Sequence, residues 1–182
     1  MKFSSIAVAL ACAVALSGCG APSTDRFAAK SFAFAETNQP VQVFSEACLK
    51  TLPNFDTFSS AVQKQGLAPT SPMAGNPAFM APGEKFLATS VIEEGDKSTC
   101  AVVFLGAENS KEIGDLFLQE ASIRTGGEPQ DRLPRGQYNY VYHLKNGSVL
   151  VYEAKNKRDH VRHFVFVTKP VSRKEAASYV YN

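Results

Sequence analysis

The sequence predicts an α+β domain: a mostly antiparallel sheet of about five strands, with helices packed on one face and one disulfide. Apolar residues recur at helical spacing near both ends of the chain and at its centre, while other segments alternate as strands do. Tight turns join neighbouring strands, so those strands must be antiparallel. No internal repeat is visible in the residues.

Two helices are expected first. Residues 41–52 place apolar side chains on one helical face, and Pro53 ends that pattern. Asn54 is a suitable N-cap for a second helix, which Gly66 would terminate. The buried positions expected in these two helices are Val43, Phe44, Ala47, Cys48 and Leu52, then Phe55, Phe58, Ala61 and Val62.

Residues 67–83 contain four prolines and are expected to form a long loop. The loop could be a binding flap with adaptable apolar contacts. We favour the alternative, a rigid cover in which Met73, Phe79 and Met80 cap the core.

The central segment predicts a strand pair followed by a helix. Strands over 85–93 and 98–105 flank a turn at 94–97, with Cys100, Val102 and Phe104 on one face. Asn109 and Glu112 resemble a capping box at the start of the helix. Its expected buried stripe is Ile113, Leu116, Phe117 and Ala121, and it ends at Gly126 and Gly127.

The last third predicts three strands and a short helix. Residues 128–137 are read as a polar loop, followed by strands over 138–144, 148–154 and 160–168. Asn146-Gly147 between the first two is a strong hairpin signal. Ser172 and Glu175 form a capping box that would open the final helix.

The cysteines favour one disulfide if the protein is exported. Of the four cysteines, Cys12 and Cys19 lie near the amino terminus, which leaves Cys48 and Cys100. In an oxidising compartment such a pair is most simply a disulfide, and it would hold the first helix against the sheet. A reactive thiol pair is the alternative, but the spacing is far from Cys-x-x-Cys.

The amino-terminal residues have the layout of an export signal. Lys2 precedes an apolar run from Ile6 to Leu16 that is too short for a bilayer core needing about 20 residues. Leu16-Ser17-Gly18-Cys19 resembles the lipobox of bacterial lipoproteins. The resemblance implies cleavage before Cys19 and diacylglycerol on its sulfur. An ordinary secretory signal with a chance cysteine is the alternative.

The resemblance also implies a domain organisation and a location. Residues 1–18 would be the signal peptide, 19–38 a lipidated tether and 39–182 a single globular domain. Gly20 is not Asp, which favours the outer membrane, facing the periplasm, over the inner membrane. Phe27, Phe32 and Phe34 are unusual for a tether and could dock on the domain or on the membrane surface.

Catalytic and metal-binding patterns are absent from the residues. His160 and His163 are three apart on a predicted strand, so they would point to opposite faces and could not chelate one metal together. The Gly-x-Ser-x-Gly elbow and phosphate-binding glycine loops are missing. We therefore expect no catalytic residues, no metal and no cofactor, and we leave an enzyme of an unfamiliar type as the least favoured possibility.

Basic and tyrosine side chains concentrate in the last third, although the whole chain has a net charge of only +2. The candidate binding surface is Tyr138, Tyr140, Tyr142, Arg158 and Arg162. The three tyrosines are two residues apart, so they should line one strand face, and which face is buried stays open. Such a surface suits an anionic envelope polymer or an acidic protein. A solvated sheet face with ordinary cross-strand tyrosine pairs is the alternative.

Two functions remain open from the residues. The first is a membrane-anchored, non-enzymatic binding or accessory module that contacts an envelope protein or an anionic polymer. The second is an inhibitor of a periplasmic or secreted enzyme, which would insert residues 67–83 or 128–137 into a cleft. No nucleic-acid partner is expected.

Overall fold

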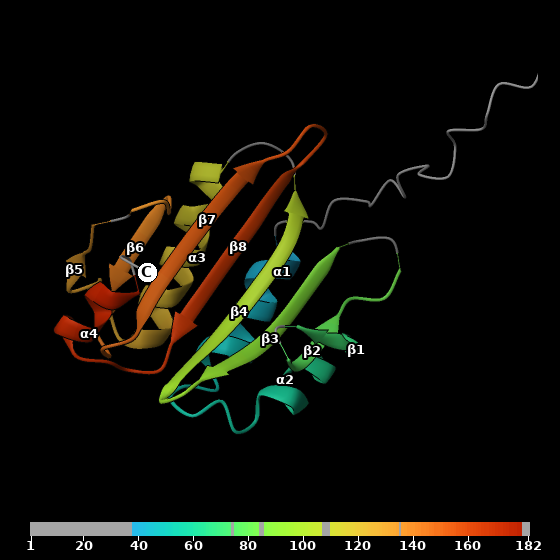
Figure 1. Cartoon of the computed structure of the whole chain (residues 1–182), viewed down its shortest axis with the longest axis horizontal. Coiled ribbons are helices and arrows are strands. Elements are labelled where there is room, and N and C mark those ends of the chain that lie inside the picture. Colours follow the sequence, from blue (N-terminus) through green and yellow to red (C-terminus); the bar gives the residue numbers. More distant parts are fainter. Residues whose placement is uncertain (1–37, 74, 84–85, 107–109, 135, 180–182) are drawn as a thin grey trace, which may run out of the picture. The chain divides into compact units, whose positions relative to one another are not determined.

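The computed structural model describes residues 38–73, 75–83, 86–106, 110–134 and 136–179. It confirms the α+β class and the antiparallel sheet, with one correction: the sheet has eight strands rather than about five. Their order is β1-β2-β3-β4-β8-β7-β6-β5 (Figure 1). The predicted signal peptide, Cys19 and all of the predicted tether except Asn38 lie outside the described residues.

The strands form two four-stranded meanders joined at one seam. Their bounds are β1 Ala68–Met73, β2 Asn76–Met80, β3 Leu87–Glu94, β4 Lys97–Gly106, β5 Asp131–Arg132, β6 Tyr140–His143, β7 Val149–Asn156 and β8 Val161–Thr168. β4 pairs with β8 from Thr99–Thr168 to Gly106–Val161. A helix precedes each meander in the chain, so the two halves have the same order of elements. The sequence shows no internal repeat that would have predicted this order.

Two segments predicted as loops contain strands. Residues 67–83 form the β1–β2 hairpin at one edge of the sheet, and β5 lies within 128–137 at the other edge. β1 carries Pro69 and Pro72. An edge strand can accept proline because one of its sides has no neighbouring strand with which its N–H groups would form hydrogen bonds. Of the three side chains expected to cap the core, Phe79 is buried in it, while Met73 and Met80 are only half-buried.

The helices differ from prediction in their details. The first segment is α-helix α1, Asn38–Val43, running into π-helix η2, Phe44–Leu49, whose wider turn is closed by the bond from Lys50 N to Ser45 O of 3.0 Å. Leu49 is buried there, whereas the predicted Leu52 is partly buried. α2 is Phe58–Lys64, so Asn54 does not cap it, and Thr57 holds the N-cap position.

The remaining helices are α3, Ser110–Thr125, and α4, Arg173–Ser178. Ile113, Phe117 and Ala121 of α3 are buried as predicted, but Leu116 is 39% exposed. Asn109, the predicted cap, lies outside the described residues. The capping box at Ser172 and Glu175 is confirmed in both of its hydrogen bonds.

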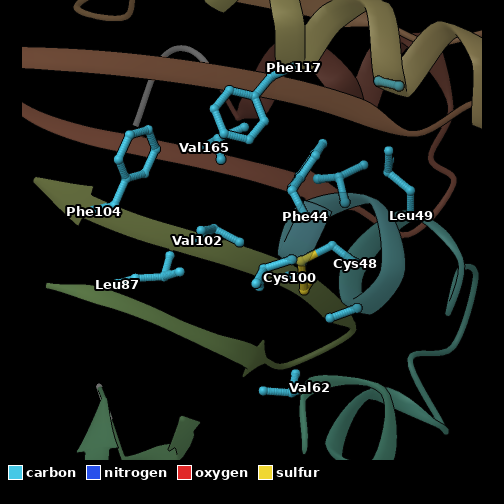
Figure 2. Close-up of a cluster of buried hydrophobic side chains, with 14 of the residues drawn as sticks. Phe44, Cys48, Leu49, Val62, Leu87, Cys100, Val102, Phe104, Phe117 and Val165 are labelled. Atoms are coloured by element: carbon cyan, nitrogen blue, oxygen red, sulfur yellow. A yellow bond between two sulfur atoms is a disulfide. The ribbon is translucent and has the colours of Figure 1, made fainter. Parts of the chain in front are cut away.

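The main core lies between the sheet and the helices α1, η2, α2 and α3 (Figure 2). Cys100, Val102 and Phe104 of β4 point into it together, as predicted. The Cys48–Cys100 disulfide is present and ties η2 to β4 over a sequence separation of 52 residues. A chain of polar contacts fixes η2 to α3, where Arg124 Nη2 lies 2.8 Å from Glu46 Oε1 and Arg124 Nε lies 3.0 Å from Ser45 Oγ.

We expect removal of the disulfide to destabilise the domain because the unfolded chain would lose a cross-link between distant residues. The Cys48→Ala/Cys100→Ala variant should lose about 2–4 kcal/mol of unfolding free energy. Urea denaturation at constant pH measures the loss, and reductant added to the unaltered protein should give a similar shift. An unchanged denaturation midpoint would contradict this assignment.

Candidate functional site

The sheet has one face covered by helices and one face largely without them. On the second face, which we call the open face, α4 and the segment before it pack over β6 and β7 (Figure 1). His143 Nε2 lies 3.2 Å from Gly147 O and 3.3 Å from Val171 O, and Val171 N donates to Gly147 O at 2.9 Å. These contacts attach the carboxyl-terminal segment to the sheet and leave β3, β4 and β8 less covered.

A groove of about 240 Å³ lies on the open face beside the end of α4. Its lining comes from β3, β4, β8, the residue before β6 and the end of α4. The members are Ile92, Glu94, Lys97, Thr99, Tyr138, Phe164, Phe166, Ser178 and Tyr179. We call this set the aromatic groove.

Aromatic side chains give the groove its shape. The Phe166 ring lies 5.5 Å from that of Phe164 and 6.3 Å from that of Tyr138, in tilted and edge-on arrangements. Such offset geometry is favourable for aromatic pairs. Lys97 Nζ lies 5.1 Å from the Tyr179 ring centroid, so a cation–π contact closes the side of the groove nearest α4. Burial raises the pKa of the Tyr179 phenol above its usual range.

The predicted binding surface is divided between both faces and a turn. Tyr138 lies in the aromatic groove and packs against the open-face cluster. Tyr140 and Tyr142 pack against the helix-side core. The alternation of side chains between the two faces does not extend to Tyr138, because β6 begins only at Tyr140. Asn139 lies before the strand, and its side-chain oxygen accepts a hydrogen bond from Ala154 N at 2.6 Å.

Neither Arg158 nor Arg162 lines the groove, although Arg162 precedes Phe164 by two residues on β8. Arg162 Nη2 is 3.9 Å from Glu153 Oε2, and Lys155 Nζ is 2.8 Å from Glu153 Oε1, so two cations share one buried carboxylate. Arg158 is exposed in the turn between β7 and β8. The structure therefore brings Arg158 and Arg162 to one hairpin and does not bring them to Tyr140 or Tyr142.

Tyr140 and Tyr142 belong to a stack of rings that crosses the sheet beneath α3. Successive ring centroids are 6.2 Å apart from Tyr142 to Tyr140, 5.8 Å from Tyr140 to Tyr152 and 6.1 Å from Tyr152 to His163. The stack ends on Phe104, 4.6 Å from His163. Arg132 caps its other end, 6.0 Å from the Tyr142 ring. The positions fit a structural role for this pair of tyrosines.

Gly114 of α3 allows the helix to approach that stack. A Cβ at this position would lie 2.4 Å from Tyr140 Cε2 and 2.9 Å from Tyr152 Cδ1. The sequence reasoning did not single out Gly114, although a glycine inside an apolar helical stripe is the signal that could have indicated close packing.

The three histidines lie in separate surroundings. His163 is fully buried, with Nδ1 2.8 Å from the Tyr152 hydroxyl, while His143 lies under the carboxyl-terminal segment. His160 is half-buried beside Asp159, at 2.7 Å. Within the described residues no three His, Cys, Asp or Glu side chains gather closely enough to hold a metal ion.

Two larger hollows are less suited to recognition by apolar contact. One, of about 310 Å³, lies between α2 and β3 beside Phe55, a buried residue at φ +61°, and has Asp56 and Glu93 in its walls. The other, of about 340 Å³, lies between η2 and α2 and is lined mainly by polar and charged side chains. We therefore take the aromatic groove as the candidate site.

No family model, curated protein or solved structure matches this chain. Among the described residues, every helix is too short or too polar to traverse a lipid bilayer.

We expect Gly114→Ala to destabilise the protein, although alanine ordinarily favours a helix over glycine by about 1 kcal/mol. The added methyl group would collide with the Tyr140 ring, at a cost of about 1–3 kcal/mol. The matched double variant Gly114→Ala/Tyr140→Leu should recover part of that loss, as chemical denaturation can measure. Stabilisation by Gly114→Ala alone would show that the helix does not approach the stack this closely.

Proposed function

We propose that this protein is a lipid-anchored lipoprotein of the bacterial envelope whose domain is a non-enzymatic binding module. The lipobox-like sequence Leu16-Ser17-Gly18-Cys19 supports the anchor, because it supplies small residues before a thiol that can carry lipid. More than one acyl chain is needed for firm anchoring, since each buried CH₂ contributes about 0.8 kcal/mol. The Cys48–Cys100 disulfide is consistent with an oxidising compartment.

The aromatic groove is the observation that carries the binding role. Ile92, Tyr138, Phe164 and Tyr179 are half-buried rather than buried, so their apolar surface remains accessible. Tyrosine and phenylalanine are enriched in protein interfaces because they provide large rigid contact areas. At the rim, Glu94 and Lys97 are cross-strand neighbours of opposite charge.

The chemistry of the groove favours a protein partner that inserts one large apolar side chain. Four of the nine residues that line this groove of about 240 Å³ are aromatic and a fifth, Ile92, is aliphatic, so apolar side chains make up about half of its lining. The Glu94–Lys97 pair leaves little net charge at the rim, which argues against an anionic polymer at this point. We therefore propose an envelope protein at this groove rather than the anionic polymer that the tyrosine and arginine pattern also suggested.

The anchor can be tested by metabolic labelling with palmitate. We expect label in the unaltered protein and none in Cys19→Ser, because the lipid is carried on that sulfur. Cys12→Ser is the matched control and should keep the label, since Cys12 lies before the cleavage site. Label retained in Cys19→Ser would disprove the anchor.

The groove can be tested in cells by placing the photoreactive residue benzoylphenylalanine at Phe164. We expect a discrete adduct that falls at least tenfold in Ile92→Glu, because a carboxylate buried against an apolar side chain has no compensating partner. Ile123→Glu is the matched control, as Ile123 is 66% exposed on α3. Equal adducts in the two variants would rule out the groove as the contact surface.

A further inference from the structure

The turn between β7 and β8 carries a cluster of basic side chains. We call Lys155, Lys157, Arg158 and Arg162 the basic tip. Lys157 N donates to His160 O at 2.8 Å, which closes the turn and holds these residues at the end of a long hairpin. Lys157 and Arg158 are exposed, and the side chains of Lys155 and Arg162 are 44% and 42% exposed.

The acidic residues near the tip leave it positive. Glu153 is buried and partly neutralises Lys155 and Arg162, while Asp159 lies 2.7 Å from His160 Nδ1. Across the described part of the chain, neither Lys157 nor Arg158 takes part in an ion pair. The tip therefore presents at least two cations whose charge is not used within the domain.

The tip and the start of the domain lie at the same end of the sheet. Val161, where β8 begins, is opposite Gly106, where β4 ends. α1, which contains the first described residue, Asn38, lies beside that half of β4 (Figure 1). A chain segment preceding Asn38 is thus attached to the end of the domain that carries the basic tip. The aromatic groove, with Glu94 and Lys97 in its lining, lies toward the opposite end.

We propose that the basic tip docks on the anionic surface of the same bilayer that holds the lipid on Cys19. This inference rests on the proposed anchor. Residues 19–37 can span at most about 65 Å when fully extended, so the anchor limits the distance between the tip and the lipid headgroups and gives the headgroups a high effective concentration at the tip. Each lysine or arginine near an anionic membrane surface increases the binding constant of the protein for that surface by about fivefold.

Docking through the tip gives the domain an orientation. With the β7–β8 turn on the bilayer, the β3–β4 turn at the far end of β4 is directed away from it, and the aromatic groove is accessible to a partner. An acidic protein could also recognise these cations, but it would have to compete with a surface that is tethered beside them.

The chain contains no tryptophan, so a single introduced tryptophan reports its own surroundings. Asn156→Trp places the reporter at the tip, and Asn146→Trp is the matched control in the turn before the other end of β7. Both asparagines are exposed. The full mature lipidated protein is reconstituted in vesicles of phosphatidylethanolamine and phosphatidylglycerol with brominated acyl chains, which quench nearby tryptophan fluorescence.

We expect quenching at position 156 to exceed that at position 146 several-fold. It should fall when salt is added, because screening weakens exposed charges, and when Lys157→Glu and Arg158→Glu are combined. The docking would be overturned by equal quenching at both positions. It would also be overturned if neither salt nor the charge-reversed variant reduced quenching at position 156. In that case the tip would be left for an acidic protein partner.

Intact mass spectrometry of the same sample separates this inference from the anchor. A diacylglycerol adduct together with equal quenching at both positions defeats only the docking. A mature chain without lipid on Cys19 defeats the anchor, and the docking with it.

Discussion

The pairing of β4 with β8 is the interaction on which the rest of this structure depends. It is the seam between two four-stranded meanders, and its register from Thr99–Thr168 to Gly106–Val161 decides which side chains face the helices. Val102 and Val165 face each other on the helix side, while Val103 and Phe164 do so on the open face. A shift of one residue would exchange the two faces, so the core and the groove are set together.

The two faces of the sheet differ in what packs against them. On the helix side, the disulfide, the Arg124 contacts and the ring stack beneath α3 hold helices against the sheet. The open face has a smaller apolar cluster, and the short helix α4 covers only part of it. The tyrosines of β6 therefore belong to the ring stack on the helix side, whereas the Phe164 ring of β8 stays partly accessible on the open face.

The sequence predicted features that depend on a few neighbouring residues, and one long-range bond that follows from the number of available thiols. Asn146-Gly147, the capping box at Ser172 and the Cys48–Cys100 bond each follow from local turn chemistry, hydrogen-bonding capacity or the count of available thiols. Strands whose own residues carry no strand pattern and that form only by pairing with a neighbouring strand were missed. β1 is proline-rich and forms only because β2 offers it a ladder, and β5 is two residues long and needs β6. Tyr138 and Tyr140 lie on opposite faces of the sheet because β6 begins only at Tyr140. The spacing of apolar residues in the sequence does not determine where a strand begins.

The central claim is that the open face is an accessible contact surface which a partner occupies in the envelope. Hydroxyl-radical footprinting tests it most directly when it compares the purified protein with the same protein in intact cells. We expect Phe164 and Tyr138 to be oxidised in the purified protein and protected in cells, while Phe117, which is fully buried, is protected in both. Equal oxidation of Phe164 and Tyr138 in the two samples would contradict the claim.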